Sequence, residues 1–536
     1  MKTWRKEDRQ PVWGRTSKAT NSDRLQFYMS YVIRNIGIWT AISVWALSLS
    51  NCYSNNYASG IVERQGNTII VRRGGNFQAA LDKANPGDTI TLESGATFKG
   101  SFRLSSKPGA EFITIRSSGR DSELPPPGKR LDPVKFGPAL AKVESDVLGE
   151  PAILAIEGAH HYRFIGIEFG PTKKGLYNII QIGSGYETRI EELPHHIEFD
   201  RVYIHGSPTE GQRRGIAANG RFLKIQNSHI SDIKREGEES QAIAIWASDG
   251  NIEITNNYLE AAAENILFGG AKNKMGLVAA NCVIDSNWMN KPIEWRETKW
   301  VVKNFIEVKS GRSLKFNNNL LTNNWAMGQE GVGVLFRTAI DSGDQAIVED
   351  IEFTNNVMRG SGSAFNLFGP EGRGARNITI RNNIFTDISS KRYGGRGSFL
   401  LATETANTLV ENNTVIHDGS IMVLHGEPMI GLVFQNNIVF NNEYGIFGDG
   451  LGSGRMALQK YAPGSIVSNN VIIGGERSAY GASNFYPLSE RLVGFLDPGN
   501  GDYSLRSDSP YIGRGVQGGR IGADLDPKTV GTVKTP

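Results

Sequence analysis

The chain has 536 residues, of which 39% are hydrophobic, and it contains 63 glycines and 2 cysteines. Its formal net charge of +3 is close to neutral and no run of Lys and Arg alternates with aromatic residues, so nucleic-acid binding is not expected. The two cysteines exclude a disulfide framework, and the high glycine content disfavours a helical protein.

Residues 1–52 are predicted to be an export region. The apolar run Ile36–Leu49 is too short to span a bilayer and is typical of the core of an export signal. A start at Met29 would place the run nearer the beginning of the signal. The residues at 49–52 resemble a bacterial lipoprotein cleavage box, although Asn51 stands where a small residue is expected. We expect an exported protein that is secreted, periplasmic or lipid-anchored at Cys52, with no transmembrane helix in the mature chain.

A short linker is predicted over 53–66, followed by a capping helix ahead of the first strands. Phe77, Ala80 and Leu81 share one helical face, Asn76 is placed to cap the first turn, and Pro86 ends the helix. Such a helix would cover the open edge of the following strands. Residues 120–150 are Pro-rich and polar, and they are predicted to be an insertion or a long loop.

A short alternating strand that ends on Asn recurs through the middle of the chain, usually with a pair of Asn residues. The gaps between successive marker residues are 30, 30, 32, 37, 27, 30, 24 and 33. Self-similarity at this period indicates a solenoid, in which Asn can take the left-handed conformation at a corner and form a hydrogen-bonded ladder. The markers are Asn227, Asn257, Asn287, Asn319, Asn356, Asn383, Asn413, Asn437 and Asn470.

Each marker is followed by a second short strand, a variable loop and a third apolar segment, such as 264–270 or 304–311. Three strands per coil predict an all-β, single-domain, right-handed parallel β-helix with three sheets and about ten or more coils. The domain is predicted over 67–524, with a C-terminal tail over 525–536. Because loops on a rigid scaffold carry function, we expect the site in the groove above the third-strand sheet.

Both ends of this region resemble a known superfamily. Residues 77–102 (FQAALDKANPGDTITLESGATFKGSF) resemble the cap and first coil of secreted pectate-lyase-like right-handed β-helix proteins, and 501–505 (GDYSL) with 521–524 (IGAD) resemble their ending. That superfamily includes polysaccharide lyases, glycoside hydrolases, epimerases and inert stems. The PGDTI opening is most similar to the alginate and chondroitin lyase branch, which uses a Lys base and an Arg acid with Ca²⁺. No catalytic motif of that branch can be carried over residue by residue.

Charged residues of the middle coils form the candidate catalytic set. In KNFIEVK, Lys303 and Glu307 alternate with apolar residues and are expected to face the groove, with Arg337 one coil further along. Lyase chemistry requires a base and a positive charge that neutralises the uronate carboxylate. We expect Lys303 to be the base and Arg337 to be the neutraliser or acid. The further candidates are Arg214 and His205 for catalysis, Arg213 for substrate binding, and Glu264 with Glu307 for a Ca²⁺ ion.

Four Trp residues and one Arg are the candidate sugar-binding residues. Trp rings stack on sugar faces, and a charged group between them could orient a polymer. The set is Trp246, Trp295, Arg296, Trp300 and Trp325. The alternative is that these Trp side chains pack the loops onto the sheet.

The expected function is cleavage of an acidic, uronate-containing polysaccharide by β-elimination, carried out by a monomer. The first alternative is a glycoside hydrolase, for which Glu260 and Glu264 offer a pair of carboxylates. The second is a non-catalytic carbohydrate-binding or structural protein, in which the charges only solvate an exposed sheet or pair across coils. Cys282 is most simply a buried small residue.

Overall fold

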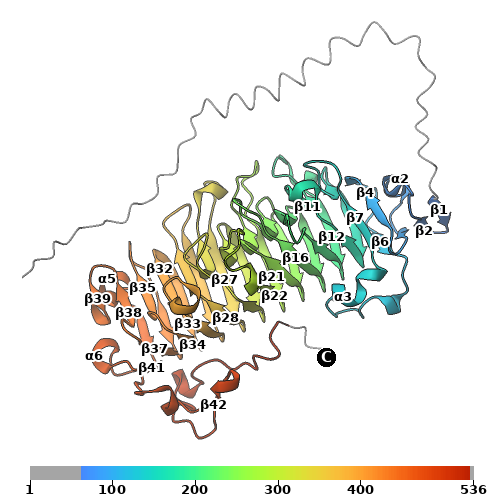
Figure 1. Ribbon diagram of the computed structural model, residues 1–536. Helices are drawn as coiled ribbons and strands as arrows, with labels where there is room; N and C mark the ends of the chain where they lie inside the picture. Colours follow the sequence, from blue (N-terminus) through green and yellow to red (C-terminus); the bar gives the residue numbers. More distant parts are fainter. Residues whose placement is uncertain (1–61, 532–536) are drawn as a thin grey trace, which may run out of the picture. The chain divides into compact units, whose positions relative to one another are not determined.

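The computed structural model describes residues 62–531, which form one elongated stack of strands (Figure 1). The export region 1–52, with Met29 and Cys52, lies outside the described residues. No helix within 62–531 is long and apolar enough to cross a bilayer. Three long sheets make up the stack, and consecutive coils pair in parallel except at the two ends, where β1 (Val62–Gln65) and β39 (Gly452–Ser453) pair antiparallel with their neighbours.

Sheet A begins each coil and contains 15 strands. Its strands are β1, β2 (Thr68–Val71), β3 (Thr89–Leu92), β6 (Ile113–Ser117), β9 (His160–Ile165), β12 (His195–Asp200), β15 (Arg221–Gln226), β18 (Gly250–Thr255), β21 (Ala280–Asp285), β24 (Gly311–Asn317), β27 (Val348–Thr354), β30 (Ala375–Arg381), β33 (Thr405–Glu411), β36 (Val433–Gln435) and β40 (Ile466–Ser468).

Sheet B follows the Asn corner and contains 13 strands. Its strands are β4 (Thr97–Lys99), β7 (Ala141–Glu144), β10 (Ile167–Phe169), β13 (Tyr203–His205), β16 (His229–Ile233), β19 (Tyr258–Ala261), β22 (Trp288–Asn290), β25 (Leu320–Thr322), β28 (Val357–Ser361), β31 (Ile384–Ile388), β34 (Thr414–His417), β37 (Ile438–Phe440) and β41 (Val471–Ile473).

Sheet C, the predicted third-strand sheet, also contains 13 strands. Its strands are β5 (Phe102–Leu104), β8 (Ile153–Ala155), β11 (Asn178–Ile182), β14 (Arg214–Ala218), β17 (Gln241–Ile245), β20 (Glu264–Phe268), β23 (Asn304–Val308), β26 (Val332–Arg337), β29 (Ser363–Phe368), β32 (Leu400–Thr403), β35 (Met422–Leu424), β38 (Ile446–Gly448) and β39.

The core is a set of inward-facing columns that run along the stack. In sheet C, Ile180, Ile216, Ile243, Ile266 and Ile306 are register partners from coil to coil, and all are fully buried. Alternation along each strand places these side chains inside, and each buried Ile stabilises the fold by about 1.5–3 kcal/mol relative to an exposed one. No coil can bury this face alone, so the coils stack.

The predicted Asn ladder is confirmed, with one correction. From Asn257 to Asn484, each ladder Asn donates its backbone N–H to the side-chain oxygen of the next over 2.8–3.1 Å. The left-handed residue, however, is the one before each ladder Asn, as in Asn355 with φ 57°. Asn227 itself has φ 55°, and Ser228 takes the ladder position. The corner therefore needs two residues, one for the turn and one for the ladder.

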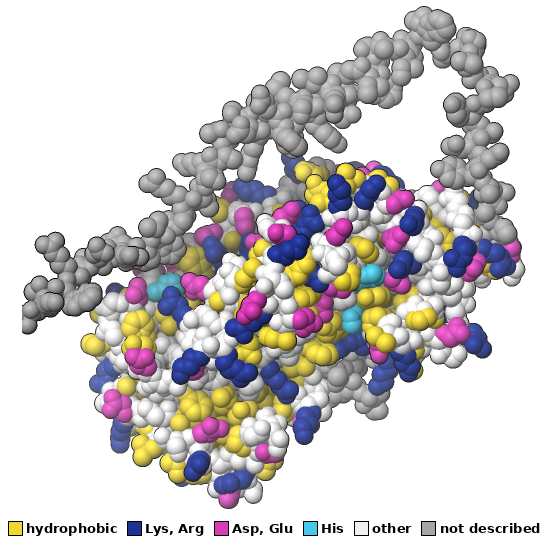
Figure 2. Space-filling model, viewed as in Figure 1, with side chains coloured by type: hydrophobic (Ala, Val, Ile, Leu, Met, Phe, Trp, Pro, Cys, Tyr) yellow, Lys and Arg dark blue, Asp and Glu magenta, His cyan; other side chains and the backbone are white. Residues whose placement is uncertain are grey.

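Charged groups on the outer faces pair between neighbouring coils. Lys224 lies 3.3 Å from Glu253, and Arg376 lies 2.6 Å from Glu349. On the face shown in Figure 2, Lys and Arg side chains are interspersed with Asp and Glu. Such exposed pairs contribute little each and mainly keep the surface mixed in charge.

The capping helix is confirmed. Helix α2 (Phe77–Lys83) has its first turn capped by Asn76, whose side chain accepts from the N–H of Ala79 over 2.9 Å. The Phe77 ring packs 4.6 Å from the ring of Phe102 on β5, between ring centroids. The open end of the stack is therefore covered by apolar contacts as well as by the antiparallel strand β1.

The structured region extends beyond the predicted boundaries. β1 lies within the segment 53–66 that was predicted to be a linker, and the 120–150 segment carries strand β7 and the short helix α3 (Pro133–Phe136) rather than only loop. The remaining helices are α4 (Ser390–Tyr393), α5 (Arg455–Tyr461) and α6 (Arg477–Tyr480), and a hairpin of β42 (Phe495–Asp497) and β43 (Asp502–Leu505) follows the last coil.

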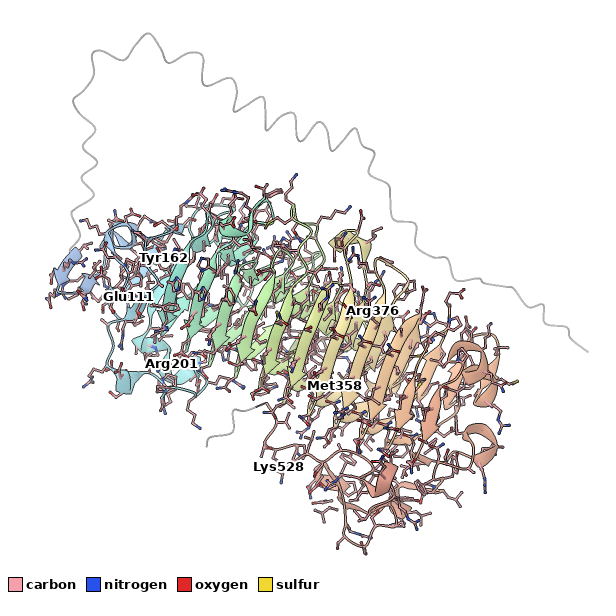
Figure 3. The ribbon with its side chains drawn as sticks, turned by 180° about the vertical axis from the view of Figure 1, so that it is seen from behind. Glu111, Tyr162, Arg201, Met358, Arg376 and Lys528 are labelled. Carbon is pink, nitrogen blue, oxygen red and sulfur yellow. The ribbon has the colours of Figure 1, made fainter. Side chains whose placement is uncertain are left out.

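The C-terminal segment runs back along the row of left-handed Asn residues. Asn469 donates to the carbonyl of Arg514, Asn412 donates to Arg520, and Asn318 accepts from Gly531. Val530 is buried against β28 and β31. In Figure 3, Lys528 marks this segment and Met358 marks β28. The predicted tail is thus docked on the coils as far as residue 531.

Candidate functional site

A chain of polar side chains crosses four adjacent coils of sheet C. The register pairs Arg214 with Gln241 and Gln241 with Glu264. Arg214 Nε donates to Gln241 Oε1 over 2.6 Å, and Gln241 Nε2 donates to Glu264 Oε2 over 2.8 Å. Glu264 Oε1 then lies 2.6 Å from Lys303 Nζ. Residues far apart in sequence are therefore joined into one network, as the coil register predicted.

Lys303 is the centre of this network and is surrounded by carboxylates. Its ammonium lies 2.8 Å from Glu239 and 3.1 Å from Glu307, in addition to Glu264. The Lys303 side chain is 5% exposed, and those of Glu264 and Glu307 are 0% and 2% exposed. Only Glu239, at 46%, reaches solvent. The network is therefore largely an interior one.

The carboxylates around Lys303 favour its charged form. Burial alone would lower its pKa, but Glu264, Glu307 and Glu239 outweigh burial and raise the pKa of Lys303. Burial also raises the pKa of Glu264, more than the Lys303 ammonium lowers it. A general base must lose its proton near the working pH. Lys303, whose side chain is 5% exposed and held by three carboxylates, is thus poorly placed to reach a substrate, and its role as base stays a prediction.

The Lys303 ammonium also lies where calcium was expected. Glu264 and Glu307 both direct an oxygen at it, so the positive charge between them is supplied by the chain itself. Calcium requires several oxygen ligands that are free to turn toward it. As ligands for a divalent ion, these two carboxylates would first have to release Lys303.

A second buried ammonium lies beside this network. Lys291 Nζ donates to the carbonyl oxygens of Ala261, Ala262 and Ala263 over 3.0, 2.9 and 3.0 Å, and to that of Asn304 over 3.0 Å. Burial lowers the pKa of Lys291. Its role is structural, because four of its five hydrogen bonds go to backbone carbonyls at the turn between sheets B and C and the fifth goes to the Asn265 side chain.

Lys309 and Arg337 form the part of the sheet C face that is open to solvent. Lys309 Nζ lies 3.1 Å from Asp341 and 3.8 Å from Glu307, and its side chain is 15% exposed. Val308 pairs with Phe336, so Lys309 and Arg337 follow equivalent positions of neighbouring strands. Arg337 contacts Glu371 over 3.0 Å and is 40% exposed. Arg337 thus lies one coil along, as predicted, but its ion-pair partner is Glu371.

A cavity of about 240 Å³ opens beside Arg337. The Arg337 Nε and the Asn366 Oδ1 are both buried atoms of its lining without a hydrogen-bond partner. Buried polar atoms are nearly always paired, so these two atoms mark a polar part of the cavity whose hydrogen bonds the chain itself does not satisfy. Leu335 and Phe368 supply an apolar floor, and Gln329 and Glu330 complete the wall.

The expected sugar-binding role of three Trp residues is contradicted by their burial. Trp295, Trp300 and Trp325 are 6%, 7% and 3% exposed and pack into one apolar cluster with Val302 and Tyr393. They fix the loops to the sheet, which was the alternative interpretation. A ring with this little exposed surface cannot stack on a sugar.

The remaining predicted binding residues lie in different places. Trp246 is half-buried, and the Arg214 guanidinium lies 5.4 Å from its ring centroid on the sheet C face. Arg213 contacts Glu238 over 3.3 Å near the same face. Arg296 donates instead to the backbone of Arg392 and lies over the Tyr393 ring. Trp246 and Arg213 therefore remain with the site, whereas Arg296 anchors a loop.

Two of the candidate residues lie on sheet B rather than on sheet C. His205 ends β13 in sheet B, where its Nε2 lies 3.0 Å from Glu168 and its ring stacks on Tyr203. Glu260 is on β19, also in sheet B, and accepts from Tyr258 over 2.7 Å. Neither side chain shares a face with Glu264 on β20. Neither His205 as a catalytic residue of the sheet C groove nor the Glu260–Glu264 carboxylate pair fits these positions.

Sequence reasoning missed Lys309, Asp341 and Glu239. Lys309 continues the alternation of Lys303 and Glu307, so the pattern itself contained that signal. Asp341 and Glu239 come from loops, whose position the register does not determine.

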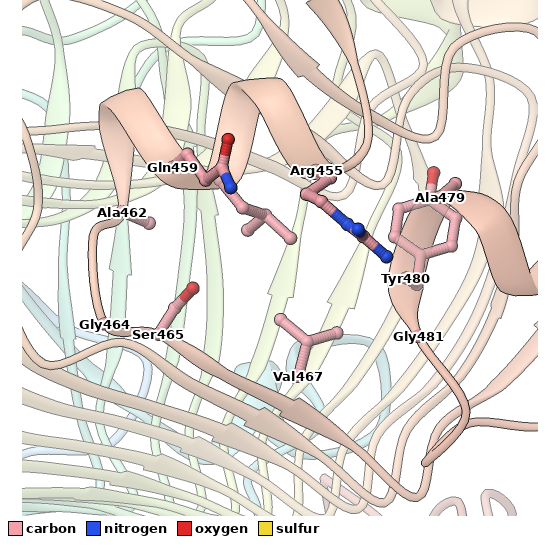
Figure 4. Close-up of a pocket in the computed structure, with 10 residues that line it drawn as sticks. Arg455, Gln459, Ala462, Gly464, Ser465, Val467, Ala479, Tyr480 and Gly481 are labelled. Carbon is pink, nitrogen blue, oxygen red and sulfur yellow. The ribbon is translucent and has the colours of Figure 1, made fainter.

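A separate cavity of about 270 Å³ at the C-terminal end lies between α5 and α6 (Figure 4). It is lined by Arg455, Tyr480 and small residues, and shares no residue with the sheet C cavity.

The fold is confirmed by comparison with known proteins. A family model described as a right handed beta helix region matches residues 297–472. The PL6 family alginate lyase AlyGC is similar at 16% identity and a TM-score of 0.53, over 88% of this chain and 59% of that one. This chain therefore spans less than two thirds of that enzyme's length. The right-handed parallel β-helix prediction is correct.

Two other solved structures are similar at lower TM-scores. An alginate lyase from Paenibacillus sp. str. FPU-7 is 18% identical, with a TM-score of 0.43, over 63% of this chain and 98% of that one. A GH136 lacto-N-biosidase from Eubacterium ramulus is 12% identical, with a TM-score of 0.46, over 77% and 64%. No curated protein is significantly similar in sequence. At these identities the likeness extends to the fold and not to the reaction.

Proposed function

We propose that the protein cleaves an acidic, uronate-containing polysaccharide by β-elimination on the sheet C face. The observation that carries this proposal is the Arg337 cavity, where Arg337 Nε and Asn366 Oδ1 have no partner and Lys309 lies at the neighbouring strand. A guanidinium with an unpaired N–H binds and neutralises a carboxylate, which makes the proton alpha to it more acidic.

Lys309 takes over the role of base from Lys303 in this proposal. It has two carboxylate neighbours, Glu307 and Asp341, and Asp341 is 49% exposed on a loop. Glu307 and Asp341 raise the pKa of Lys309 against the effect of burial. A substrate that displaces Asp341 would remove the Lys309–Asp341 ion pair. A high solution pH would then favour the neutral amine of Lys309, which is the form that acts as a base. Lys303 keeps the buried carboxylates paired and holds the strand in place.

Positive side chains of the chain supply the charge that the reaction requires at the substrate carboxylate. Arg337 and Lys309 lie at the centre, and Arg214 beside Trp246 extends the positively charged face toward the N-terminal coils. Calcium remains a testable part of the proposal, with Glu307, which lies 3.8 Å from Lys309, as one of its expected ligands. A chelator added to the assay decides whether a metal takes part.

The wild-type protein should be incubated with pectate, alginate and glycosaminoglycans, each with calcium or with a chelator. Alginate is included because AlyGC is an alginate lyase. The proposal expects unsaturated products, detected by ultraviolet absorbance, on at least one of these polymers. New reducing ends without that absorbance would indicate a glycoside hydrolase. Binding without cleavage would indicate a non-catalytic carbohydrate-binding protein.

A further inference from the structure

Four histidines gather on sheet A, apart from the sheet C face. His160 and His161 begin β9, and His195 and His196 begin β12 on the next coil. The labelled Tyr162 marks β9 in Figure 3. The His160 and His195 rings stack with centroids 4.7 Å apart, and the His161 and His196 rings stack at 4.6 Å. The register of the coils thus builds two layers of imidazole rings.

Within each coil, the two rings meet through their Nδ1 atoms. The Nδ1 atoms of His160 and His161 are 2.7 Å apart, and those of His195 and His196 are 2.8 Å apart. A contact this short requires that one nitrogen donates a proton and the other accepts it. Each coil therefore directs one imidazole lone pair at the position of a single shared proton, and a metal ion could replace that proton.

The backbone holds the rings in this arrangement. His161 and His196 have φ of 58° and 51°, the left-handed conformation that turns two consecutive side chains to the same side. The Phe112 ring packs 5.2 Å from His161 at one end, and Phe222 packs 4.8 Å from His196 at the other. The imidazoles are half-buried between these aromatic rings, which limits their competition with water.

The group has the donors that a transition metal requires. Within residues 62–531, His160, His161 and His195 are the one group of three His, Cys, Asp or Glu whose ligand atoms lie within 4.8 Å of one another. Tetrahedral zinc has nitrogen ligands at about 2.0–2.1 Å, which places the nitrogens roughly 3.3 Å apart. Small rotations of the rings bring the three nitrogens to that separation, and His196 is adjacent as a fourth donor.

The protonation state also favours metal binding. Burial and the neighbouring imidazoles lower the pKa of His195 to about 4, and burial lowers the pKa of the other three. Glu198 and Arg221 are the charged groups nearest to the rings, and Glu198 is paired with Arg163 over 2.5 Å. Neutral imidazole is the form that ligates metals, so little proton displacement is needed near neutral pH.

We propose that His160, His161 and His195, with His196 beside them, form a binding site for a divalent transition-metal ion that prefers imidazole, of the class of Zn²⁺, Ni²⁺ and Cu²⁺. The ion joins two coils of the stack, because the ligands come from β9 and β12. Its readouts are metal affinity and thermal stability, so it is tested independently of any activity on polysaccharide.

The test is calorimetric titration of the metal-stripped, untagged protein with Zn²⁺ and, separately, with Ca²⁺. The proposal expects one Zn²⁺ per chain, a rise in melting temperature with Zn²⁺, and no comparable binding of Ca²⁺. The variants are His161→Asn and His195→Ala. Further along sheet A, Asn281 occupies the position equivalent to His161 and Ala280 the position equivalent to His195, so the coil already accommodates both residue types. These variants should therefore fold, and each should weaken Zn²⁺ binding at least about tenfold.

The control variant is His425→Ala, a half-buried histidine outside the group, which should leave Zn²⁺ affinity unchanged. Absence of stoichiometric Zn²⁺ binding by the wild type would overturn the proposal. Binding that survives His161→Asn and His195→Ala, or that is lost in His425→Ala, would overturn it equally. X-ray absorption of the zinc-loaded protein should show imidazole nitrogens as the dominant ligands.

Discussion

The Lys303 ammonium lies 2.6 Å from the carboxylate of Glu264, whose side chain is fully buried. Glu307 and Glu239 contact the same ammonium. One positive charge thus lies between Glu264 and Glu307, which the register of sheet C brings together, and Glu239 from a loop. The first consequence of this ion pairing concerns stability, because a buried carboxylate without a partner is strongly unfavourable.

Lys303→Met should therefore destabilise the protein by about 3–5 kcal/mol, since it leaves Glu264 and Glu307 without their cation. Chemical denaturation followed by circular dichroism measures this loss. Lys224→Met is the matched control, because Lys224 pairs with Glu253 at a surface where both are about half exposed. The control should change stability by less than about 0.5 kcal/mol. Equal effects of the two variants would contradict the structural role of Lys303.

The Asn corner gives a second prediction, based on two adjacent residues. Asn356 accepts a hydrogen bond from Asn319 and donates one to Asn383 within the buried ladder, each over 2.8 Å. Asn356→Ala should therefore lower the free energy of unfolding by about 1–3 kcal/mol for each buried group left unpaired. Asn355 has φ 57°, so Asn355→Gly removes its side chain without backbone strain. Denaturation midpoints should rank wild type, Asn355→Gly and Asn356→Ala in decreasing order. The opposite order of the two variants would show that the turn residue, not the ladder, holds the corner.

The buried Trp cluster gives a third prediction, which separates packing from sugar binding. Trp325→Ala should lower stability by about 3–5 kcal/mol because it empties a filled site in the core. Trp246→Ala should cost less, because this ring is half-buried, and should instead weaken binding of an acidic oligosaccharide. Thermal melts and affinity electrophoresis measure the two effects. Weakened oligosaccharide binding by a folded Trp325→Phe variant would restore a sugar-binding role to the cluster.

The pH dependence of cleavage follows from Lys309. Glu307 and Asp341 raise its pKa, so the neutral amine becomes populated only as the pH rises toward that raised value. Initial rates should therefore increase about tenfold per pH unit above neutrality, without a plateau near neutral pH. A plateau at neutral pH would exclude Lys309 as the base.

Asp341→Asn sharpens this prediction by removing one of the charges that raise the pKa of Lys309. The alkaline rise should then shift to lower pH. Asp344→Asn, on the same loop, is the matched control and should leave the profile in place. Identical shifts in both variants would indicate a general effect of loop charge.

The fold was predictable because its rules repeat in every coil. Alternating apolar residues and the Asn corner recur in most coils of the sequence. Assigning Asn227 to the ladder, where Ser228 stands, therefore did not disturb the predicted register. The site was predictable only in part. Glu264, Lys303 and Glu307 follow from strand alternation, whereas Glu239 and Asp341 come from loops that no periodicity places.

The wrong assignments have physical causes as well. Trp325 and Trp246 are the same residue type, and burial, which separates their roles, depends on the folded loop. Lys303 was expected to be the base, but the direction of its pKa shift depends on three carboxylates whose distances the sequence does not give. His205 ends the short strand that follows the left-handed residue Arg201 and therefore belongs to the second strand of its coil, but no Asn marks this corner in the sequence.

We place the proposed uronide cleavage at the Arg337 cavity of sheet C. The most direct measurement is the rate of unsaturated product formation by the wild type, Arg337→Ala and Lys309→Ala, with Arg376→Ala on sheet A as the control. Arg376, labelled in Figure 3, lies on β30 of sheet A and pairs with Glu349 of the same sheet. The predicted result is a loss of at least about 100-fold in the two sheet C variants and an unchanged rate in the control. A wild type that forms no unsaturated product on any uronide, or sheet C variants as active as the wild type, would contradict the claim.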